Sequence, residues 1–502
     1  MAATISSALK WWAQETPDQL ALRVGDQDIR YAELDAWVDR IADHLQREGL
    51  QRGERVGTIG GTSIVHCALL LGTIRAGGIA SPVSARLTER EAFEFFEKTR
   101  PSRVYLDADQ LARHPRLGEI AGAQRPMADL DALRAAAFEP RHWDGDPEDA
   151  VGIIATSGST ARPKGVVYTN RSMLSYAAEF SMGEAFCGPG SRGIALSPLS
   201  TSGGFVQMIE YIVLGATLRF ESAFDPERAL QLLAGERINM FQGVPLFFER
   251  IAACPGFAEA DLSQLRFTGI GGARVPASLL DTWIKKGCLL RQIYGQTEAG
   301  GAITFMSRRD GEKYPEKAGR GGMFTEIRII DENGAFLGPN QTGQIVIRGP
   351  SVMRGYWEDP EATARTLVDG WLRTGDLGSV DEQGYLSFFD RMKDIIISGG
   401  LNISAAEVER VVAEFPGVLE VAVIGAADDR FGETPLAVVH ARAGLDVAAL
   451  VAHCNQYLSN YKVPRYVELE PEPLPRLATG KLAKPAIRSK YEPLVPGLVR
   501  VR

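Results

Sequence analysis

The ten residues TSGSTARPKG, from Thr156 to Gly165, combine residue types that can bind anions. They follow an apolar run and bring glycines and hydroxyl side chains together with one lysine, Lys164. Glycines let backbone N–H groups approach anionic oxygens, hydroxyls add donors, and a lysine adds positive charge. The segment is not a Walker A loop, because the pattern G-x-x-x-x-G-K-[ST] is absent. Taken alone, it fits a phosphate-binding loop and a Ser/Gly surface turn equally well.

Three further segments carry polar or charged groups that could do chemistry. YGQTEAG, from Tyr294 to Gly300, places a glutamate beside a threonine, and a hard cation prefers a carboxylate together with phosphate oxygens. GWLRTGD ends at Asp376, whose carboxylate can accept two hydroxyl donors at once. PRLATGKL supplies Lys481, a point charge that can stabilise developing negative charge. The alternative for each is a solvated turn or an exposed lysine.

These segments, in this order, resemble the motifs of the adenylate-forming superfamily, which includes acyl- and aryl-CoA synthetases, peptide-synthetase adenylation domains and firefly luciferase. The resemblance spans nearly the whole chain and is greatest to an acyl- or aryl-CoA synthetase. It implies that TSGSTARPKG holds the pyrophosphate part of ATP, and that ATP, Mg²⁺ and coenzyme A take part in the reaction. One departure is Ala161, where the family usually has glycine; alanine tolerates a positive φ poorly, so we expect a stiffer loop.

The resemblance also implies roles for single residues. Thr297 reaches the α-phosphate, Glu298 is the metal ligand, and Lys481 bonds the substrate carboxylate and the α-phosphate; these three are the predicted catalytic residues. The predicted ATP- or AMP-binding residues are Thr156, Ser157, Gly158, Ser159, Thr160, Lys164, Gly271, Gly272, Ala273, Tyr294, Gly295, Asp376 and Arg391.

The segment ISGGLNISAAEVE, from Ile397 to Glu409, resembles the family loop that enters the active site for the second step. Gly399 and Gly400 would leave room there for the pantetheine arm of CoA, and they form the predicted CoA tunnel. Ser404 and Glu407 also fit a capping box, S-x-x-E, at the start of a helix. Capping is therefore the role favoured for Glu407.

The acid is expected to bind beside the segment SPLSTSGGFVQMIEY. No acidic residue occurs from Ser200 to Val206, where peptide-synthetase adenylation domains hold a substrate amine, so an α-amino acid is disfavoured. Thr201 replaces the histidine that orients the acyl site in relatives, and Glu210 is assigned to the helix body. Small and apolar side chains predict a roomy pocket for an aromatic or medium-chain aliphatic acid. The predicted pocket residues are Thr201, Ser202, Gly203, Phe205, Phe241 and Gly269.

The motifs together predict an ATP-dependent acid–thiol ligase. The carboxylate attacks the α-phosphorus, pyrophosphate leaves, and the thiol of CoA then displaces AMP from the acyl-adenylate. A carboxylate is already ionised at neutral pH, so positioning and charge neutralisation can supply most of the catalysis. The alternatives are a stand-alone adenylation enzyme that loads an acyl carrier protein, a luciferase-like oxygenase, and a non-catalytic nucleotide-binding relative.

Composition narrows the class of protein further. The chain has 502 residues, which predicts two to four domains, and its net charge of -8 disfavours a nucleic-acid partner. The five cysteines and six histidines are scattered, which argues against a zinc site or a Cys-His nucleophile. The N-terminus lacks the pattern of a signal peptide, and no apolar stretch is long enough to span a bilayer. We therefore expect a cytoplasmic protein whose partners are the acid, ATP and CoA, with a homodimer as the assembly to test.

Alternating elements must position these residues. From about Val151 to Glu298, short apolar runs end in Gly-, Ser- or Pro-rich turns and alternate with helical patterns, which indicates an α/β domain. In such domains ligands gather at the carboxyl ends of the strands. From about Phe324 to Ser387, short strands between turns predict a small β-rich subdomain.

After Arg391 the chain begins a compact α+β unit, with helices expected at 404–415 and 446–458. The predicted fold is therefore α/β, with a large N-terminal domain at residues 1–391 that binds ATP and the carboxylate. A small, mobile C-terminal lid domain follows at residues 392–502. By resemblance, Lys393 is the hinge between them.

Overall fold

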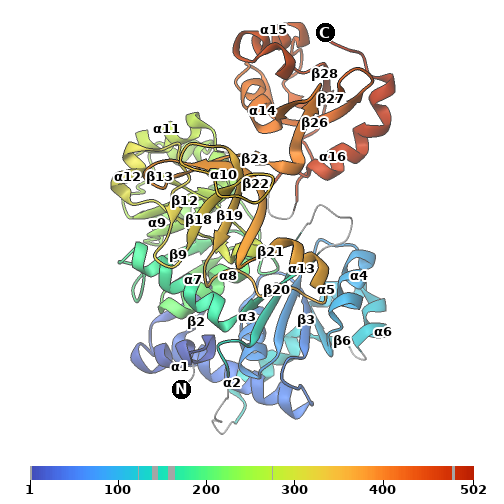
Figure 1. Cartoon of the computed structure of the whole chain (residues 1–502). Helices are drawn as coiled ribbons and strands as arrows, with labels where there is room; N and C mark the ends of the chain where they lie inside the picture. Colours follow the sequence, from blue (N-terminus) through green and yellow to red (C-terminus); the bar gives the residue numbers. More distant parts are fainter. Residues whose placement is uncertain (1–2, 122–123, 138–144, 157–163, 274, 478–480) are drawn as a thin grey trace. The chain divides into compact units, whose positions relative to one another are not determined.

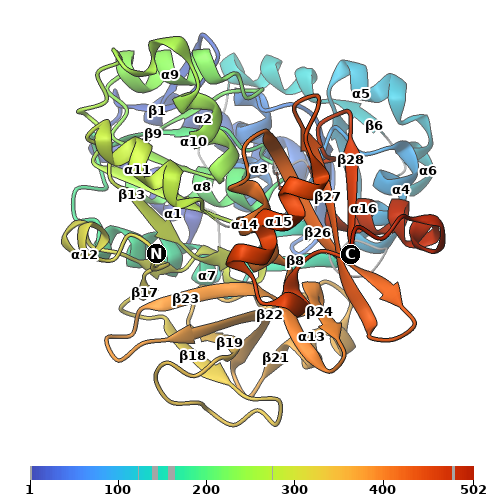
Figure 2. The same ribbon diagram turned by 90° about the horizontal axis from the view of Figure 1, so that it is seen from above.

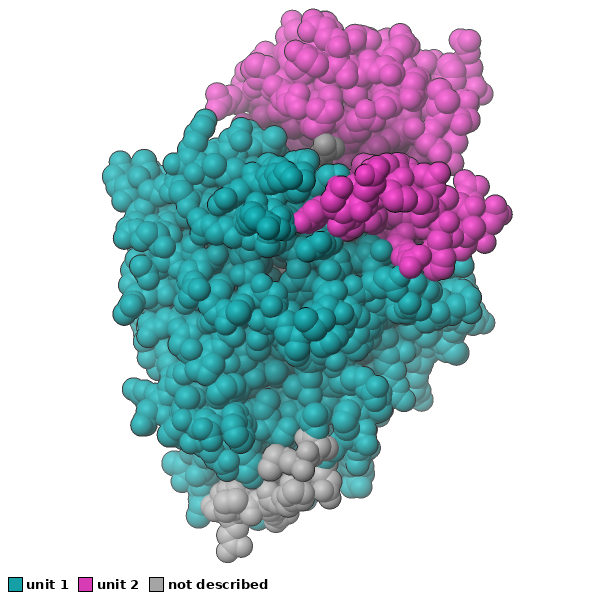
Figure 3. Space-filling model, turned by 60° about the vertical axis from the view of Figure 1, so that its left-hand side comes forward, with its two compact units in different colours: residues 1–327, 346–373 teal, residues 328–345, 374–502 magenta. Residues whose placement is uncertain are grey.

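The computed structural model describes residues 3–121, 124–137, 145–156, 164–273, 275–477 and 481–502. The chain forms two compact units, coloured separately in Figure 3. The large unit contains residues 1–327 and 346–373, and the small unit contains residues 328–345 and 374–502. The predicted boundary between residues 391 and 392 falls within the small unit and stays a prediction about movement.

The first sheet of the large unit is parallel except at one edge. Its strand order is β13-β12-β11-β9-β10-β1-β2, and only β2 is antiparallel to its neighbour among these described strands. The apolar runs predicted to be buried strands form β9, β11, β12 and β13, so their carboxyl ends share one edge. The strands are β1 (Leu20–Val24), β2 (Gln27–Arg30), β9 (Arg192–Ala195), β10 (Thr217–Phe220), β11 (Met240–Gly243), β12 (Phe267–Gly271) and β13 (Leu290–Ile293).

Helices bury the faces of this sheet. On one face, Phe241 of β11 packs with Phe248 and Trp283 in a core that α9 (Pro226–Gly235), α10 (Pro245–Ala252) and α11 (Ala277–Lys285) share. The other helices in this part of the chain are α1 (Ile5–Glu15), α2 (Tyr31–Arg47), α3 (Ile64–Arg75), α7 (Asn170–Gly183), α8 (Ser202–Leu214) and α12 (Arg308–Lys313). Of these, α7 and α8 pack against each other (Figure 1).

The second sheet of the large unit has the order β20-β8-β7-β4-β3-β5-β6. Its β7 and β8 form an antiparallel pair in which Thr156 faces Lys164, so both ends of the predicted phosphate loop are neighbours. The strands are β3 (Arg55–Ile59), β4 (Ile79–Val83), β5 (Arg103–Leu106), β6 (Gln124–Pro126), β7 (Ala150–Thr156), β8 (Lys164–Thr169) and β20 (Gly355–Tyr356). The helices beside it are α4 (Glu89–Thr99), α5 (Ala108–Arg113) and α6 (Gly118–Ala121).

A five-stranded sheet, in which β21 and β23 are antiparallel to β22, occupies the region predicted to be β-rich. It contains β18 (Glu326–Ile330), β19 (Gly343–Arg348), β21 (Leu367–Val368), β22 (Trp371–Val380) and β23 (Leu386–Arg391). Shorter strands precede it: β14 (Gly295–Gln296), β15 (Gly301–Ala302), β16 (Thr304–Phe305) and β17 (Arg320–Gly321). The β-rich prediction is confirmed, but it overlooked a helix, α13 (Pro360–Thr366). Asp359 caps this helix and Pro360 begins it, a favoured combination at a helix start.

The C-terminal part of the small unit is a sheet with helices on both faces (Figure 2). Its order is β25-β24-β27-β26, with β28 parallel to β27. Alternate residues of β26 and β27 face α14 and α15 on one side and α16 on the other, as the period of two in a strand requires. The elements are β24 (Ile395–Ser398), β25 (Leu401–Ser404), α14 (Ala405–Ala413), β26 (Val418–Asp428), β27 (Gly432–Ala441), α15 (Val447–Tyr457), β28 (Tyr466–Glu470) and α16 (Lys484–Tyr491). Both helices expected here are confirmed.

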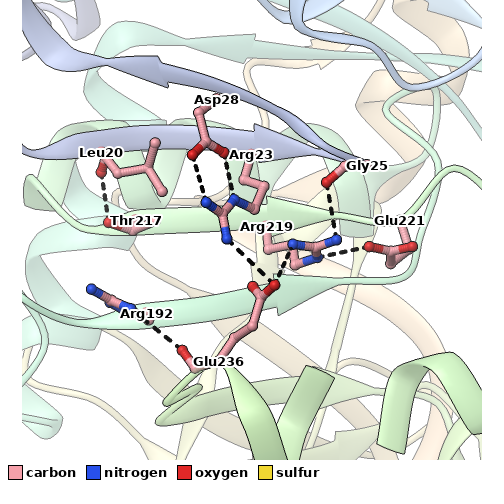
Figure 4. Close-up of polar contacts among 9 residues, drawn as sticks. All are labelled: Leu20, Arg23, Gly25, Asp28, Arg192, Thr217, Arg219, Glu221 and Glu236. Carbon is pink, nitrogen blue, oxygen red and sulfur yellow. Dashed lines mark hydrogen bonds and ion pairs between the residues drawn. The ribbon is translucent and has the colours of Figure 1, made fainter. Parts of the chain in front are cut away.

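A network of charges joins the first three strands at the β2 edge of the parallel sheet (Figure 4). Arg219 on β10 is buried and donates to Glu221 and to Glu236, at 2.7 Å each. The same Glu236 oxygen accepts from Arg23 on β1 at 3.4 Å, and Arg23 also pairs with Asp28 on β2. This network fixes β10 and β1 side by side.

A hollow of about 410 Å³ opens beside this network. It begins at Leu20, Arg192 and Thr217, which are the first residues of β1, β9 and β10. The hollow therefore lies at the amino ends of parallel strands, the edge opposite to that where ligands of α/β folds bind.

No helix in the described ranges is long and apolar enough to cross a membrane.

Candidate active site

The predicted site residues of the large unit follow the carboxyl ends of its parallel strands. Pro198 to Thr201 follow β9, Gly272 follows β12, and Tyr294 follows β13. Because these strands are parallel and adjacent, their carboxyl ends bring the three segments to one edge of the sheet. The sequence analysis expected this edge to hold the ligands.

Glu298 lies in a short 3-10 helix, η4 (Thr297–Ala299), and contacts a tyrosine from a distant segment. The Tyr356 hydroxyl donates to Glu298 Oε1 at 2.9 Å. The Lys164 ammonium lies 4.7 Å from the centre of the Tyr356 ring, within the range of a cation–π contact. Burial, and then the Glu298 charge, raise the pKa of Tyr356, so this hydroxyl stays protonated as a donor. Tyr356 thus connects the predicted metal ligand with the predicted phosphate-binding lysine.

A second tyrosine joins the Thr297 backbone to the predicted acyl pocket. The Tyr168 hydroxyl donates to the Thr297 carbonyl at 2.8 Å and shares a hydrogen bond of 3.1 Å with Ser202 Oγ. Its ring stacks on Phe205, with ring centres 6.3 Å apart. Tyr168 therefore couples the position of η4 to the start of α8.

Neither Tyr168 nor Tyr356 was among the predicted site residues. Tyr168 lies on β8, which begins at the end of the phosphate-loop segment, and Tyr356 lies on β20, which joins β8 by antiparallel pairing. No local spacing in the sequence indicates that pairing. The tyrosine in the run Val166 to Thr169 was the only local signal, since a buried tyrosine needs a partner for its hydroxyl.

Thr201 is the N-cap of α8. Its hydroxyl accepts from the Gly204 N–H at 3.2 Å and donates to the Pro198 carbonyl at 2.7 Å. A Cβ at Gly204 would collide with the same carbonyl, so the turn requires glycine there. The residue that replaces the family's histidine thus caps a helix in this structure.

The other predicted pocket residues differ in exposure. Gly203 is exposed and Ser202 is half-buried, whereas Phe205, Phe241 and Gly269 are fully buried. Phe205 packs on Tyr168, and Phe241 packs on Phe248 with ring centres 4.6 Å apart. The buried phenylalanines belong to the core, and their predicted contact with the acid stays a prediction.

The predicted nucleotide residues of the large unit occupy two glycine-rich turns. Gly271 is buried at the end of β12, while Gly272, with φ of 79°, and Ala273 are exposed. Tyr294 is buried, and its backbone N–H donates to Thr304 Oγ1 at 2.7 Å; Gly295 begins β14. A Cβ at Gly295 would collide with the Gly301 carbonyl, which explains the glycine by close approach. Thr156 ends β7, and the predicted loop residues Ser157, Gly158, Ser159, Thr160 and Ala161 lie outside the described residues.

Asp376 and Arg391 are brought together in the small unit. They are partners across the antiparallel pair β22 and β23, with Arg391 Nε 3.8 Å from Asp376 Oδ1. Asp376 is buried, and its own N–H donates to Thr374 Oγ1 at 3.0 Å. Lys393 follows in a 3-10 turn, η5 (Met392–Asp394), and is exposed.

The last predicted residues of the small unit lie in turns. Gly399 and Gly400, with φ of 58° and 80°, form the exposed two-residue turn between β24 and β25, where both residues need positive φ. Lys481 is half-buried, and its carbonyl accepts from the Leu477 N–H at 2.8 Å.

The predicted capping box at α14 is half correct. Ser404 accepts from the Glu407 N–H at 3.2 Å, as predicted. The Glu407 carboxylate does not return to the cap; it accepts from Lys462 Nζ at 2.7 and 2.8 Å. A charged partner from a distant segment therefore outcompetes the local backbone N–H.

Known proteins resemble this chain over most of its length. The family described as AMP-binding enzyme matches residues 9–357, and AMP-binding enzyme C-terminal domain matches residues 407–481. A feruloyl-CoA synthase from Amycolatopsis sp is 34% identical, covering 95% of this chain and 97% of the relative. A long-chain-fatty-acid–CoA ligase from Mycobacterium tuberculosis is 31% identical, covering 98% of both chains.

Among solved structures, ATP-bound MatB from Rhodopseudomonas palustris superposes with a TM-score of 0.90 at 30% identity. The superposition covers 99% of this chain and 100% of that one. Family match, relatives and fold all extend over nearly the whole length. The chain therefore belongs to the AMP-binding enzyme family.

Proposed function

We propose that the chain is an AMP-forming carboxylate–CoA ligase, which adenylates a carboxylic acid with ATP and transfers the acyl group to CoA. The observation that carries this function is the contact of Lys164 with Tyr356, both from the second sheet, and of Tyr356 with Glu298, which follows the parallel strand β13 and lies next to Thr297. The relatives named as feruloyl- and fatty-acid–CoA ligases support a thiol acceptor and either an aromatic or an aliphatic acid.

The residues fit a magnesium ion. Glu298 is half-buried, and among the described residues its carboxylate accepts from the neutral Tyr356 hydroxyl alone, so it keeps lone pairs for a cation. Mg²⁺ is commonly held by one or two carboxylates together with substrate phosphates. When bound, the ion would neutralise charge on the phosphates. Tyr356 orients the Glu298 carboxylate for this task.

The chain's own groups then hold the reactants in line. We propose that Thr297 contacts the α-phosphate, that Lys164 binds the leaving pyrophosphate, and that Lys481 neutralises charge at the attacking carboxylate. Asp376 and Arg391 hold the ribose and the nucleotide. Each is a positioning or electrostatic role, which suits a nucleophile that is already ionised.

The first experiment measures pyrophosphate release over a panel of carboxylates, with and without CoA. AMP and an acyl-thioester that form only with CoA support the ligase. An adenylate that CoA cannot discharge indicates a carrier protein as acceptor, and no release with any acid indicates a nucleotide-binding relative. A cytoplasmic location and a homodimer are further proposals, which fractionation and solution scattering can test.

Lys481→Ala gives a sharper test of the chemistry. A positioned charge aimed at developing negative charge is a large catalytic contribution, so we expect adenylation to fall about 100-fold or more. ATP binding, measured by calorimetry, should change far less. Lys490→Ala is the control, because Lys490 is an exposed lysine paired with Glu470. Equal adenylation rates in wild type and Lys481→Ala would contradict the assigned role.

A further inference from the structure

Glu210, on α8, carries a buried carboxyl that the proposed function does not use. The residue is 1% exposed, and neither carboxyl oxygen has a hydrogen-bond partner among the residues that the structure describes. Leaving a buried polar group unpaired destabilises the folded state, so folding alone gives no reason for a glutamate here. A group of this kind points to a role in binding.

Glu210 lies on the face of α8 that begins at the predicted acyl pocket. Residues 203, 207 and 210 are spaced i, i+4 and i+7, so they share one face of the helix. Exposure falls steadily along this face: Gly203 is exposed, Gln207 is half-buried and Glu210 is buried. The face therefore runs from an open end at the start of α8 to a closed end at Glu210.

The elements around Glu210 also lie next to the segment that carries Glu298. Helix α8 contacts β15 (Gly301–Ala302), which directly follows the Glu298 segment. On α7, Tyr176 lies within electrostatic range of Glu210, and a Cβ at Gly301 would meet its ring at 3.1 Å. Glu210 thus lies in the interior bounded by α7, α8 and the strand after η4.

The surroundings of Glu210 are neutral. Burial raises the pKa of Glu210 to about 8, so the carboxyl is mostly protonated at pH 7 and can both donate and accept. The titratable groups within electrostatic range of it are Tyr176 on α7, Tyr211 on α8 and Cys187 after α7. Burial raises the pKa of each of these three, so all remain neutral at pH 7. A buried, neutral site favours a neutral partner, because a buried charge costs more than a buried hydroxyl.

We propose that Glu210 is a specificity-determining residue at the closed end of the acyl pocket, where it hydrogen-bonds a hydroxyl group at the end of the acid remote from its carboxylate. This role rests on the proposed function. It narrows the substrate class to hydroxylated aromatic or aliphatic acids, because a hydroxyl both accepts from and donates to a protonated carboxyl.

The test uses the full-length protein and two matched pairs of acids. These are cinnamate with 4-hydroxycinnamate, and octanoate with 8-hydroxyoctanoate, compared by kcat/KM for pyrophosphate release. The hydroxylated acid of at least one pair should be preferred about tenfold or more, since its absence leaves the carboxyl unpaired. Glu210→Leu should abolish or invert this preference, and Glu210→Gln should retain part of it. The wild-type preference should decline above pH 8, while that of Glu210→Gln stays level.

Glu179→Gln is the matched control for removing a buried acid. Glu179, on α7, is equally buried, but it accepts from the backbone N–H groups of Phe324 and Thr325. Its replacement should lower the melting temperature and leave the hydroxyl preference unchanged.

Four results would overturn the role of Glu210. Equal kcat/KM within both pairs, or a preference that survives in Glu210→Leu, removes the role while the ligase activity stands. A preference for 8-aminooctanoate over 8-hydroxyoctanoate shows that the carboxyl takes a cation instead. If the wild-type protein does not release pyrophosphate with any of the acids tested, both the ligase function and this role are refuted.

Discussion

At the scale of single residues, Tyr356 contacts two predicted site residues, although no sequence motif indicates this role. It is the hydroxyl donor to Glu298 and the ring beneath Lys164, so one side chain orients both a carboxylate and a cation. Partners that orient a metal ligand commonly change metal affinity by 10- to 100-fold when they are removed. The magnesium requirement of the enzyme should therefore respond to this tyrosine.

Tyr356→Phe keeps the ring beneath Lys164 but removes the hydrogen bond to Glu298. We expect the Mg²⁺ concentration for half-maximal adenylation to rise about tenfold, because the free carboxylate no longer holds one orientation. Initial rates at a series of Mg²⁺ concentrations measure this. Tyr105→Phe is the control, since Tyr105 is a buried tyrosine whose hydroxyl has no partner among the described residues. An unchanged Mg²⁺ requirement in Tyr356→Phe would show that the hydrogen bond does not contribute to Mg²⁺ binding.

The sequence identifies some of these residues and not others, for a physical reason. Lys164 and Glu298 stand in short motifs, where a lysine among glycines or a glutamate after a threonine already indicates the chemistry. Tyr168 and Tyr356 act through contacts between segments far apart in the chain, which strand pairing alone creates. The Glu407 cap was misjudged for the same reason, since Lys462 lies 55 residues away.

At the scale of elements, the strands of the parallel sheet depend on a shared carboxylate. Glu236 accepts from Arg219 on β10 and from Arg23 on β1 (Figure 4), and Arg219 is buried. A buried guanidinium that loses a charged partner keeps its desolvation cost without the compensating bond. The pairing of β10 with β1 should thus be sensitive to this one side chain.

Glu236→Gln should lower the free energy of unfolding by about 1–3 kcal/mol, because Arg219 loses one of its charged acceptors. Adenylation at 25 °C should stay near the wild-type rate, since no predicted site residue belongs to the network. Thermal denaturation followed by circular dichroism measures the first effect and pyrophosphate release the second. Glu259→Gln, at an exposed glutamate, is the matched control. Equal melting temperatures for the two variants would mean that the network adds nothing to stability.

Elements with strong local patterns were predictable from the sequence. Buried strands such as β12 and β13 are indicated by apolar runs that end at turns. Helix α14 is indicated by Val408, Val411 and Val412, which the helical period places on one face. The helix α13 escaped because it is seven residues long and mostly exposed, so it has little apolar periodicity. Its only local signal was Asp359 followed by Pro360, which indicates a helix start but is not followed by an apolar repeat.

At the scale of the whole molecule, the order of the motifs predicted the fold class more securely than any one element did. Each motif alone fits a surface turn, but a series in fixed order restricts the chain to one family, which residues 9–357 and 407–481 confirm. The division into functional domains at residue 391 is a statement about motion between catalytic steps. It stays a prediction, because it concerns conformations beyond a single fold.

The unpaired carboxyl on α8 makes proton uptake part of folding. In the unfolded chain Glu210 ionises near pH 4.5, whereas burial raises its pKa to about 8, so between these values the folded protein holds a proton that the unfolded chain has released. Its contribution to stability is therefore complete below pH 4.5 and is lost progressively up to pH 8, at about 1.4 kcal/mol per pH unit. The melting temperature of the wild type should fall relative to that of Glu210→Gln as the pH rises from 4.5 to 8. A melting-temperature difference that stays constant over this range would contradict the linkage. The stability of this protein then depends on the same proton that its pocket offers to an incoming hydroxyl.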